Sequence, residues 1–414
     1  MSIPKPVRGT RDILPDAHRR HRRVTETACE IASAYGFAEI STPIIEFTEV
    51  FARTLGDTSD IVTKEMYTFD DKGGDSITLR PENTAGIARA FLSNGLAQDL
   101  PLKFFCHGPM FRYERPQKGR QRQFHQIDVE ILGVPGPLAD VEVIALGAHV
   151  MEALGVEDKV TCELNTLGDP ESRNVYRKKL VDYLEGHRDR LSEDSLVRLE
   201  RNPLRIFDSK DEGDRAVIAD APLLIDSLND ASRKYFDDLM EGLETAGVSF
   251  HLNPRLVRGL DYYCHAAFEF VTETLGAQGA VLAGGRYDGL IEQMGGPPTP
   301  ATGWAAGVER LAMMIEEPPR PAPPIAVVPV GDGQAGRALG LTQKLRRAGL
   351  TVDLGYSGDL GKRMKRANKI KARAAVLLGE DELARDAATV RDMETGEQVE
   401  VPLASLEEHL RRYR

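Results

Sequence analysis

Three arginines stand in separate segments of the chain, each beside aromatic, glycine or carboxylate residues. Arg112 lies in Phe-Arg-Tyr-Glu-Arg-Pro-Gln (111–117), Arg258 in Leu-Val-Arg-Gly-Leu-Asp-Tyr-Tyr (256–263), and Arg310 ends Gly-Trp-Ala-Ala-Gly-Val-Glu-Arg (303–310). A guanidinium group binds phosphate and carboxylate oxygens through paired hydrogen bonds. The three segments therefore predict one pocket for a polyphosphate and a small polar ligand.

Residues 123–132 alternate polar and apolar side chains, which is typical of a β-strand. One face of this predicted strand carries Gln126, Asp128 and Glu130. The other carries His125, Ile127, Val129 and Ile131. Taken alone, the polar row indicates a face in contact with water.

The preceding segment changes this interpretation. Arg112 and Glu114 have the same two-residue spacing, so the two segments predict a hairpin with both polar rows on one face. The loop between them, Arg115 to Arg122, is long and basic, which favours contact with phosphates. We therefore expect the hairpin to form part of the pocket.

A strand end and a helix start are predicted at Arg-Pro-Glu-Asn-Thr-Ala, residues 80–85. Pro81 suits a first helical turn, and Asn83 or Thr84 suits the cap. Glu82 is then left to accept hydrogen bonds from a ligand ammonium group. In 303–310, small residues lead into a helix whose first turn holds Arg310.

Composition sets the class of protein. The 414 residues suffice for two or three domains, and 41% hydrophobic with 28% charged residues is typical of a globular protein. No apolar run reaches 18 residues, and the N-terminus has no apolar signal core, so we expect a cytoplasmic protein without a membrane span. The four cysteines form no CxxC pair, which argues against a zinc ribbon or a disulfide framework.

Local charge matters more here than the net charge of -11. The hairpin loop is basic, and seven Lys and Arg side chains with no acid fall within 362–373. An isolated basic run is most simply a solvated helix face.

A proline-rich linker at 317–324 divides the chain. After it, strand and helix patterns alternate, which predicts a small α/β domain with a mostly parallel sheet. Gly-Asp-Gly-Gln-Ala-Gly at 331–336 fits a dinucleotide fingerprint, but the domain is too short for that fold. Before the linker, strand patterns predict an antiparallel sheet with flanking helices, and charged helical patterns between about 165 and 250 predict an insertion.

Together these residues resemble class II aminoacyl-tRNA synthetases. The hairpin is similar to their second motif, 303–310 to the third, and 35–46 to the first, dimer-forming motif. Residues 256–263 and 124–133 resemble the histidine-binding segments of histidyl-tRNA synthetases, and the resemblance runs from Arg8 to Glu382. It implies an α+β catalytic domain at 1–320 with a helical insertion at about 168–250, and a C-terminal α/β anticodon-binding domain at 325–414.

The resemblance also implies a role for each site residue. Glu130 and Tyr263, with Tyr262 beside them, would bind the histidine ring. The α-amino group would be held by Glu82, Thr84 and Gln126. Arg258 would bridge the substrate carboxylate and the α-phosphate. Arg112 would also bind the α-phosphate. The other ATP-binding residues would be Glu114, Arg120 and Arg310.

On the same basis, Arg115 and Gln117 would meet the acceptor end of histidine tRNA. The implied ligands are ATP, Mg²⁺, L-histidine and that tRNA, and the implied assembly is a homodimer. The resemblance does not determine the magnesium ligands or the role of Trp304.

Two other interpretations compete with a histidine enzyme. One is a synthetase-like regulatory subunit of histidine biosynthesis, a class that has lost pocket residues and the anticodon-binding domain. Here the three arginines and the C-terminal domain are present. The other is a synthetase for a different amino acid, which only Glu130 and the 258–263 segment argue against.

Overall fold

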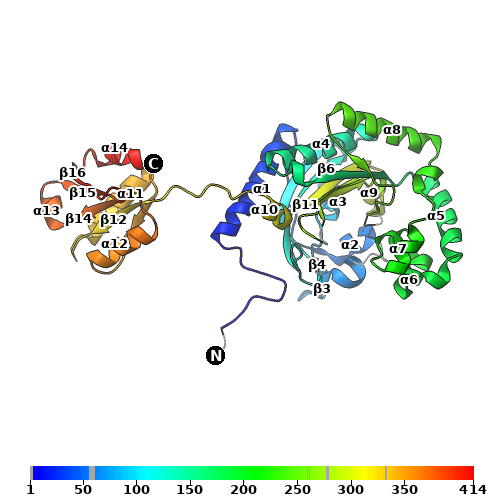
Figure 1. Cartoon of the computed structure of the whole chain (residues 1–414), viewed down its shortest axis with the longest axis horizontal. Helices are drawn as coiled ribbons and strands as arrows, with labels where there is room; N and C mark the ends of the chain where they lie inside the picture. Colours follow the sequence, from blue (N-terminus) through cyan, green and yellow to red (C-terminus); the bar gives the residue numbers. More distant parts are fainter. Residues whose placement is uncertain (1–2, 56–60, 259, 261, 277–278, 332) are drawn as a thin grey trace. The chain divides into compact units, whose positions relative to one another are not determined.

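The computed structural model describes residues 3–55, 61–258, 260, 262–276, 279–331 and 333–414. The chain forms two compact units, Met1–Pro318 and Pro319–Arg414, whose elements are labelled in Figure 1. Gly259 and Asp261, from the segment around Arg258, lie outside the described residues. No helix in the described ranges is both long and apolar enough to cross a membrane.

The first unit is built on a large, mostly antiparallel sheet. Within the described residues its strands lie in the spatial order β1 (Ala38–Glu39), β5 (Leu102–Phe111), β6 (Gln123–Leu132), β11 (Ala301–Gly307), β10 (Ala280–Arg286), β9 (Cys264–Val271), β7 (Thr161–Thr166) and β8 (His251–Leu252). Only the outermost pairs, β1 with β5 and β7 with β8, are parallel.

The two faces of this sheet differ. Ile127, Val129 and Ile131 of β6 pack into an apolar core with one set of helices. These helices are α1 (Pro15–Ala34), α4 (Pro137–Ala153), α8 (Asp230–Thr245) and α10 (Val308–Met314). The opposite face carries the polar row of β6. A second core, with Phe91 and Tyr287, covers part of that face and includes α2 (Thr48–Leu55), α3 (Thr84–Ser93) and α9 (Leu290–Gln293). The predicted division of β6 into an apolar and a polar face is therefore correct.

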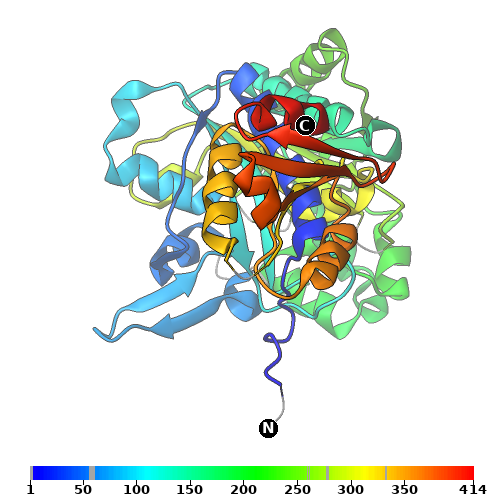
Figure 2. The same ribbon diagram turned by 90° about the vertical axis from the view of Figure 1, so that its left-hand side faces the viewer.

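A separate three-stranded antiparallel sheet has the order β2 (Ile45–Phe47), β4 (Ser76–Leu79) and β3 (Tyr67–Asp70). Figure 2 shows the blue hairpin of β3 and β4 extending away from the large sheet. A π-helical turn, Ile61–Glu65, precedes it.

Between β7 and β8 the chain makes a helical insertion with α5 (Pro170–Glu185), α6 (Glu193–Arg201), α7 (Glu212–Ile218) and α8. Its helices start where short polar side chains cap them, as Asp169 accepts a hydrogen bond from the Ser172 amide at 2.7 Å. Helices α5 to α7 share an apolar core of their own, around Leu180 and Ile206. Helix α8 packs on α4, which anchors the insertion to the large sheet.

The second unit has a five-stranded sheet in the order β13 (Val352–Leu354), β12 (Ile325–Pro329), β14 (Ala374–Leu378), β15 (Ala387–Asp392) and β16 (Gln398–Pro402). Its helices are α11 (Ala335–Arg347), α12 (Leu360–Lys369), α13 (Glu380–Ala384) and α14 (Leu406–Leu410). The expectation of a mostly parallel sheet is wrong, because β15 and β16 add two antiparallel pairings to the two parallel ones.

Candidate active site

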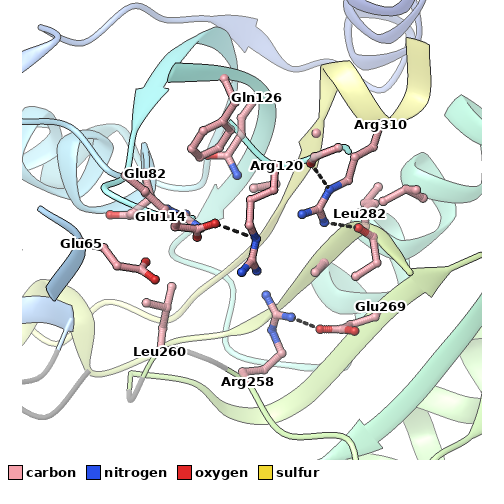
Figure 3. A pocket seen from close by; sticks show the side chains of 18 of the residues that line it. Glu65, Glu82, Glu114, Arg120, Gln126, Arg258, Leu260, Glu269, Leu282 and Arg310 are labelled. Atoms are coloured by element: carbon pink, nitrogen blue, oxygen red, sulfur yellow. Dashed lines mark hydrogen bonds and ion pairs between the residues drawn. The ribbon is translucent and has the colours of Figure 1, made fainter. Parts of the chain in front are cut away.

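A cavity of about 340 Å³ opens on the polar face of the large sheet. Figure 3 shows the guanidinium groups of Arg120, Arg258 and Arg310 pointing into the same space. Guanidinium groups bind phosphate and carboxylate oxygens, so the cavity can take an anionic ligand beside the carboxylates that also line it. The predicted site residues that line it are Glu82, Thr84, Arg112, Glu114, Arg120, Gln126, Arg258, Tyr262, Tyr263 and Arg310.

Backbone carbonyls hold two of the arginines. The Nε of Arg112 donates to the Pro81 carbonyl at 2.9 Å, and the Nε of Arg310 donates to the Gly119 carbonyl at 3.1 Å. Arg112 follows β5 directly and is not on the strand, in contrast to the sequence expectation. The guanidinium of Arg310 also donates to the Ala280 carbonyl. Both arginines line the cavity, where they can contact a ligand.

Arg258 is held by a side-chain partner that the sequence interpretation missed. Its guanidinium forms an ion pair with Glu269 of β9 and lies 5.2 Å from the centre of the Tyr263 ring. Burial acts to lower the pKa of Arg258, but Tyr263 and Glu269 outweigh it and raise that pKa. Arg258 therefore keeps its charge although its side chain is only 14% exposed.

The environment of Arg310 is different. Burial, followed by the positive charge of Arg120, lowers the pKa of Arg310. Arg120 itself pairs with Glu114 at 2.6 Å. An anion bound between these two arginines would relieve their repulsion, which is a physical reason to expect phosphate at this end of the cavity.

Glu82 does not have the free carboxylate that was expected. One of its oxygens accepts a hydrogen bond from the Thr84 amide at 2.9 Å and the other accepts from the Ala85 amide at 2.8 Å. Glu82 thus caps helix α3 itself, whereas the Asn83 side chain makes no capping bond. Burial raises the pKa of Glu82. A cationic group of a ligand would stabilise its ionised form.

Glu130 lies deeper than the other predicted residues and is not among the described residues that line the cavity. Its carboxylate accepts hydrogen bonds from the Thr84 hydroxyl, at 2.6 Å, and from the Tyr287 hydroxyl. Burial raises its pKa well above the usual value. Glu130 therefore joins the start of α3 to Tyr287, the residue that follows β10, behind the cavity wall.

The neighbouring strand explains how a carboxylate fits there. Gly303 of β11 pairs with Glu130, and a Cβ on Gly303 would lie 1.8 Å from a Glu130 carboxylate oxygen. The next residues on the same face of β11, Ala305 and Gly307, are also small. The small residues 303–307 lead into α10 at Val308, as expected, but they also form the end of a central strand, which was not expected. Their small side chains leave room for the polar row of β6.

Asp128 is fully buried between the cavity and β5. Its carboxylate accepts a hydrogen bond from the Asn83 amide at 3.1 Å, and its other oxygen is without a partner in the described part of the chain. Burial, only partly offset by that bond, raises the pKa of Asp128 to about 7.

This shift predicts a dependence of stability on pH. Because the pKa of Asp128 is higher in the folded chain than its ordinary value of 3.8, the carboxyl contributes stability that is fully present below about pH 4 and lost as pH rises through 7. The expected loss is roughly 4 kcal/mol at 1.36 kcal/mol per pKa unit. Asp128→Asn should reduce the slope by the share of Asp128 in urea unfolding followed by the fluorescence of Trp304, the single tryptophan. The buried Glu82 and Glu130, whose pKa values are also raised, should keep their own contributions.

The matched control is Asp237→Asn, on the exposed side of α8. It should keep the wild-type slope between pH 4 and 8. A slope that is equally steep in Asp128→Asn would show that another group titrates.

The hairpin loop places the two predicted tRNA contacts outside the cavity. Arg115 and Gln117 are both exposed, and Gln117 pairs with Arg120 across the tip of the loop. The cavity also contains residues that the sequence interpretation did not single out, among them Glu65, Arg205, Glu269 and Glu309. Only Glu269 carried a clear signal, as an acid within the apolar run 266–271.

The fold and the arginine-lined cavity are those of a class II aminoacyl-tRNA synthetase. Residues 9–311 match the family model described as "Histidyl-tRNA synthetase", and residues 324–413 match the model "Anticodon binding domain". The chain belongs to the histidyl-tRNA synthetase family.

Relatives match over nearly their full length. The histidine--tRNA ligase of Rhodospirillum rubrum is 64% identical over 414 residues, covering 100% of both chains, and that of Gluconacetobacter diazotrophicus is 56% identical, covering 99% of both. The structure of apo histidyl-tRNA synthetase from S. aureus is 34% identical with a TM-score of 0.82, covering 98% of this chain and 99% of that one.

Proposed function

We infer that the chain activates L-histidine with ATP to histidyl-adenylate and then transfers the histidyl group to the 3' end of histidine tRNA. The observation that carries this inference is the convergence of three guanidinium groups beside Glu82, Thr84 and the two tyrosines, in a member of this family. Such a cavity can bind a polyphosphate and an amino acid next to each other.

In the first step, a histidine carboxylate oxygen attacks the α-phosphate of ATP in line with the bond to the leaving pyrophosphate. Arg258 would bridge the carboxylate and the α-phosphate, with Arg112 on the same phosphate. Arg120 and Arg310 would hold the β- and γ-phosphates. In the second step, a terminal ribose hydroxyl of tRNA attacks the carbonyl carbon and AMP leaves. Both steps rely on positioning and charge stabilisation, without a protein nucleophile.

Recognition of histidine would use the two tyrosines of the cavity wall and Glu130, which lies behind it. A neutral imidazole has one donor and one acceptor nitrogen. Glu130 would accept from the ring and keep Thr84 and Tyr287 in place, while Tyr263, with Tyr262 beside it, would complete the ring site. Glu82, Thr84 and Gln126 would bind the α-ammonium group.

Magnesium fits this site chemically. Mg²⁺ binds oxygen ligands and usually combines substrate phosphates with one or two carboxylates. Glu114 and Glu269 line the cavity near the arginines and are the carboxylates in the best position to hold it. Bound Mg²⁺ would neutralise charge on the phosphates and orient the leaving group.

Exchange of labelled pyrophosphate into ATP, measured with each standard amino acid, tests this function. We expect exchange with histidine and no other amino acid. Exchange with a different amino acid would contradict the assigned specificity. Exchange with no amino acid would favour the regulatory-subunit alternative. The full-length matches to named histidine--tRNA ligases argue against that alternative.

Residues 1–320 would form the catalytic domain, which contains the helical insertion at about 168–250. Residues 325–414 would bind the anticodon. In α12, Lys362, Lys365 and Lys369 are exposed, at a spacing that places them on one side of the helix. They would face RNA. Arg115 and Gln117 would contact the acceptor end.

The three-stranded sheet supports a homodimer. Phe47, Ile77 and Phe69 lie directly opposite one another on β2, β4 and β3, so their side chains share one face. Ile45 joins them two residues along. Phe47 is 55% exposed, Ile45 47% and Phe69 46%. A contiguous apolar sheet face of this kind marks an interaction site, and we propose that a second copy of the chain covers it.

Charging this face should therefore dissociate the dimer. We expect the double variant Phe47→Glu/Phe69→Glu to sediment as a monomer in analytical ultracentrifugation at concentrations at which the wild type is dimeric. Leu138→Glu is the matched control, because Leu138 is 76% exposed in the first turn of α4 and should leave the dimer intact. A double variant that remains dimeric would place the interface elsewhere.

A further inference from the structure

Three side chains that can bind a metal meet where α1, β6 and α10 come together. They are His21 of α1, His125 of β6 and Glu309 of α10, and one ligand atom from each lies within 4.8 Å of the others. The proposed adenylation steps use none of the three. Only Glu309 lines the active-site cavity.

Two of these residues are already bonded to each other. Glu309 accepts a hydrogen bond from the His125 backbone amide at 2.9 Å, and its other oxygen lies 2.8 Å from Nδ1 of His125. This pair fixes the first turn of α10 against β6. A hydrogen-bonded pair explains these two side chains without a metal.

The hydrogen-bonded pair does not explain why the His21 side chain is buried beside it. It is only 7% exposed, and in the part of the chain that the structure describes its imidazole has no hydrogen-bond partner. Its ring meets that of His125 edge-on, with centroids 5.7 Å apart. A histidine with so little exposure and no hydrogen bond from its ring among the described residues has its ring nitrogens available to a ligand.

The donor set narrows the kind of ligand. Two imidazoles and one carboxylate suit a first-row transition ion such as Zn²⁺, which often keeps three protein ligands and an open position. Mg²⁺ and Ca²⁺ prefer oxygen ligands.

We propose that His21, His125 and Glu309 form a site for one divalent transition-metal ion of the zinc type, with water in the fourth position. Bonds of about 2.0–2.2 Å would draw the three ligand atoms closer together by side-chain rotation. If Nδ1 is the ligand atom of His125, its ring proton must lie on the other nitrogen. The ion would join α1 to the two elements that carry Gln126 and Arg310, and so brace the active site from behind.

Titration of the full chain with Co²⁺ tests the proposal independently of enzyme activity. We expect one Co²⁺ per chain, with visible absorption bands typical of a four-coordinate nitrogen and oxygen site. Added Zn²⁺ should abolish these bands by displacement. His21→Asn should weaken binding at least tenfold, since removing one of three ligands removes a metal bond. Pyrophosphate exchange, run with Mg²⁺ but without added Co²⁺ or Zn²⁺, should stay within about twofold of wild type, because His21 does not line the cavity.

His18→Asn is the matched control, since His18 is exposed on the same helix. It should bind Co²⁺ as wild type does. If His21→Asn fails to fold, the same titration of His21→Gln replaces it, with folding judged by the fluorescence of Trp304. The proposal is overturned by equal affinity in wild type and the His21 variant, which would indicate an adventitious ion only, or by no binding at 0.1 mM Co²⁺, about the weakest affinity expected of a specific site.

Discussion

Arg258→Gln should lower the rate of histidine-dependent pyrophosphate exchange by about 10²–10³-fold, the usual effect of removing one donor that stabilises transition-state charge. The guanidinium of Arg258 points into the cavity with Arg120 and Arg310 and is already fixed by Glu269. A rigid cation of this kind helps most where negative charge builds up during the reaction. The loss should therefore appear mainly in kcat, with a smaller change in KM for ATP.

A control must separate this effect from damage to the fold, since Arg258→Gln leaves Glu269 without its partner. Arg255→Gln changes an exposed arginine of the same segment and should retain near wild-type exchange. Arg258→Lys should recover part of the activity, because a lysine supplies charge without the paired donors. Full activity in Arg258→Gln would rule out the bridging role.

Glu130→Gln should reduce kcat/KM for histidine by about 10²-fold. Glu130 accepts hydrogen bonds from two hydroxyls, those of Thr84 and Tyr287. A glutamine amide offers one acceptor and one donor, so one hydroxyl would face an N–H group, and a buried mismatch of this kind costs about 1–3 kcal/mol. The change should also remove the acceptor proposed for the histidine ring.

The matched control is Glu163→Gln, on β7 of the same sheet and outside the cavity. It should leave kcat/KM unchanged. Exchange measured with other amino acids shows whether Glu130→Gln also loses selectivity. Wild-type kinetics with histidine in Glu130→Gln would contradict a role for Glu130 in the ring site.

The family and the class of fold were predictable from the sequence, because the arginine segments and the alternating strand are local signals. The patterns at 76–79 and 374–378 predict strands, and β4 and β14 have these bounds. β11 was missed, since Ala-Thr-Gly-Trp-Ala-Ala-Gly has little intrinsic strand preference. It is a strand because it pairs with β6 and β10 on its two sides. On the face that carries the polar row of β6, Glu130 leaves no room for a side chain at Gly303.

The sequence also could not reveal how deeply each side chain of the polar row lies behind the cavity. Alternation placed Gln126, Asp128 and Glu130 on one face, which is correct, but it did not show that only Gln126 reaches the cavity. The cap formed by Glu82 was missed for a similar reason, because Asn83 and Thr84 were equally good candidates by residue type. The β15–β16 hairpin, with its mixed polar pattern, was not recognised either.

The order of strands in the large sheet has a consequence for how the protein is made. β6 ends at Leu132, but its neighbour β11 begins at Ala301, after the whole helical insertion has been translated. At about 5–20 residues per second, a nascent chain spends on the order of ten seconds with one edge of β6 unpaired. The cavity is completed only when Arg310 has left the ribosome, so until then the half-built sheet exposes a strand edge that is prone to aggregation.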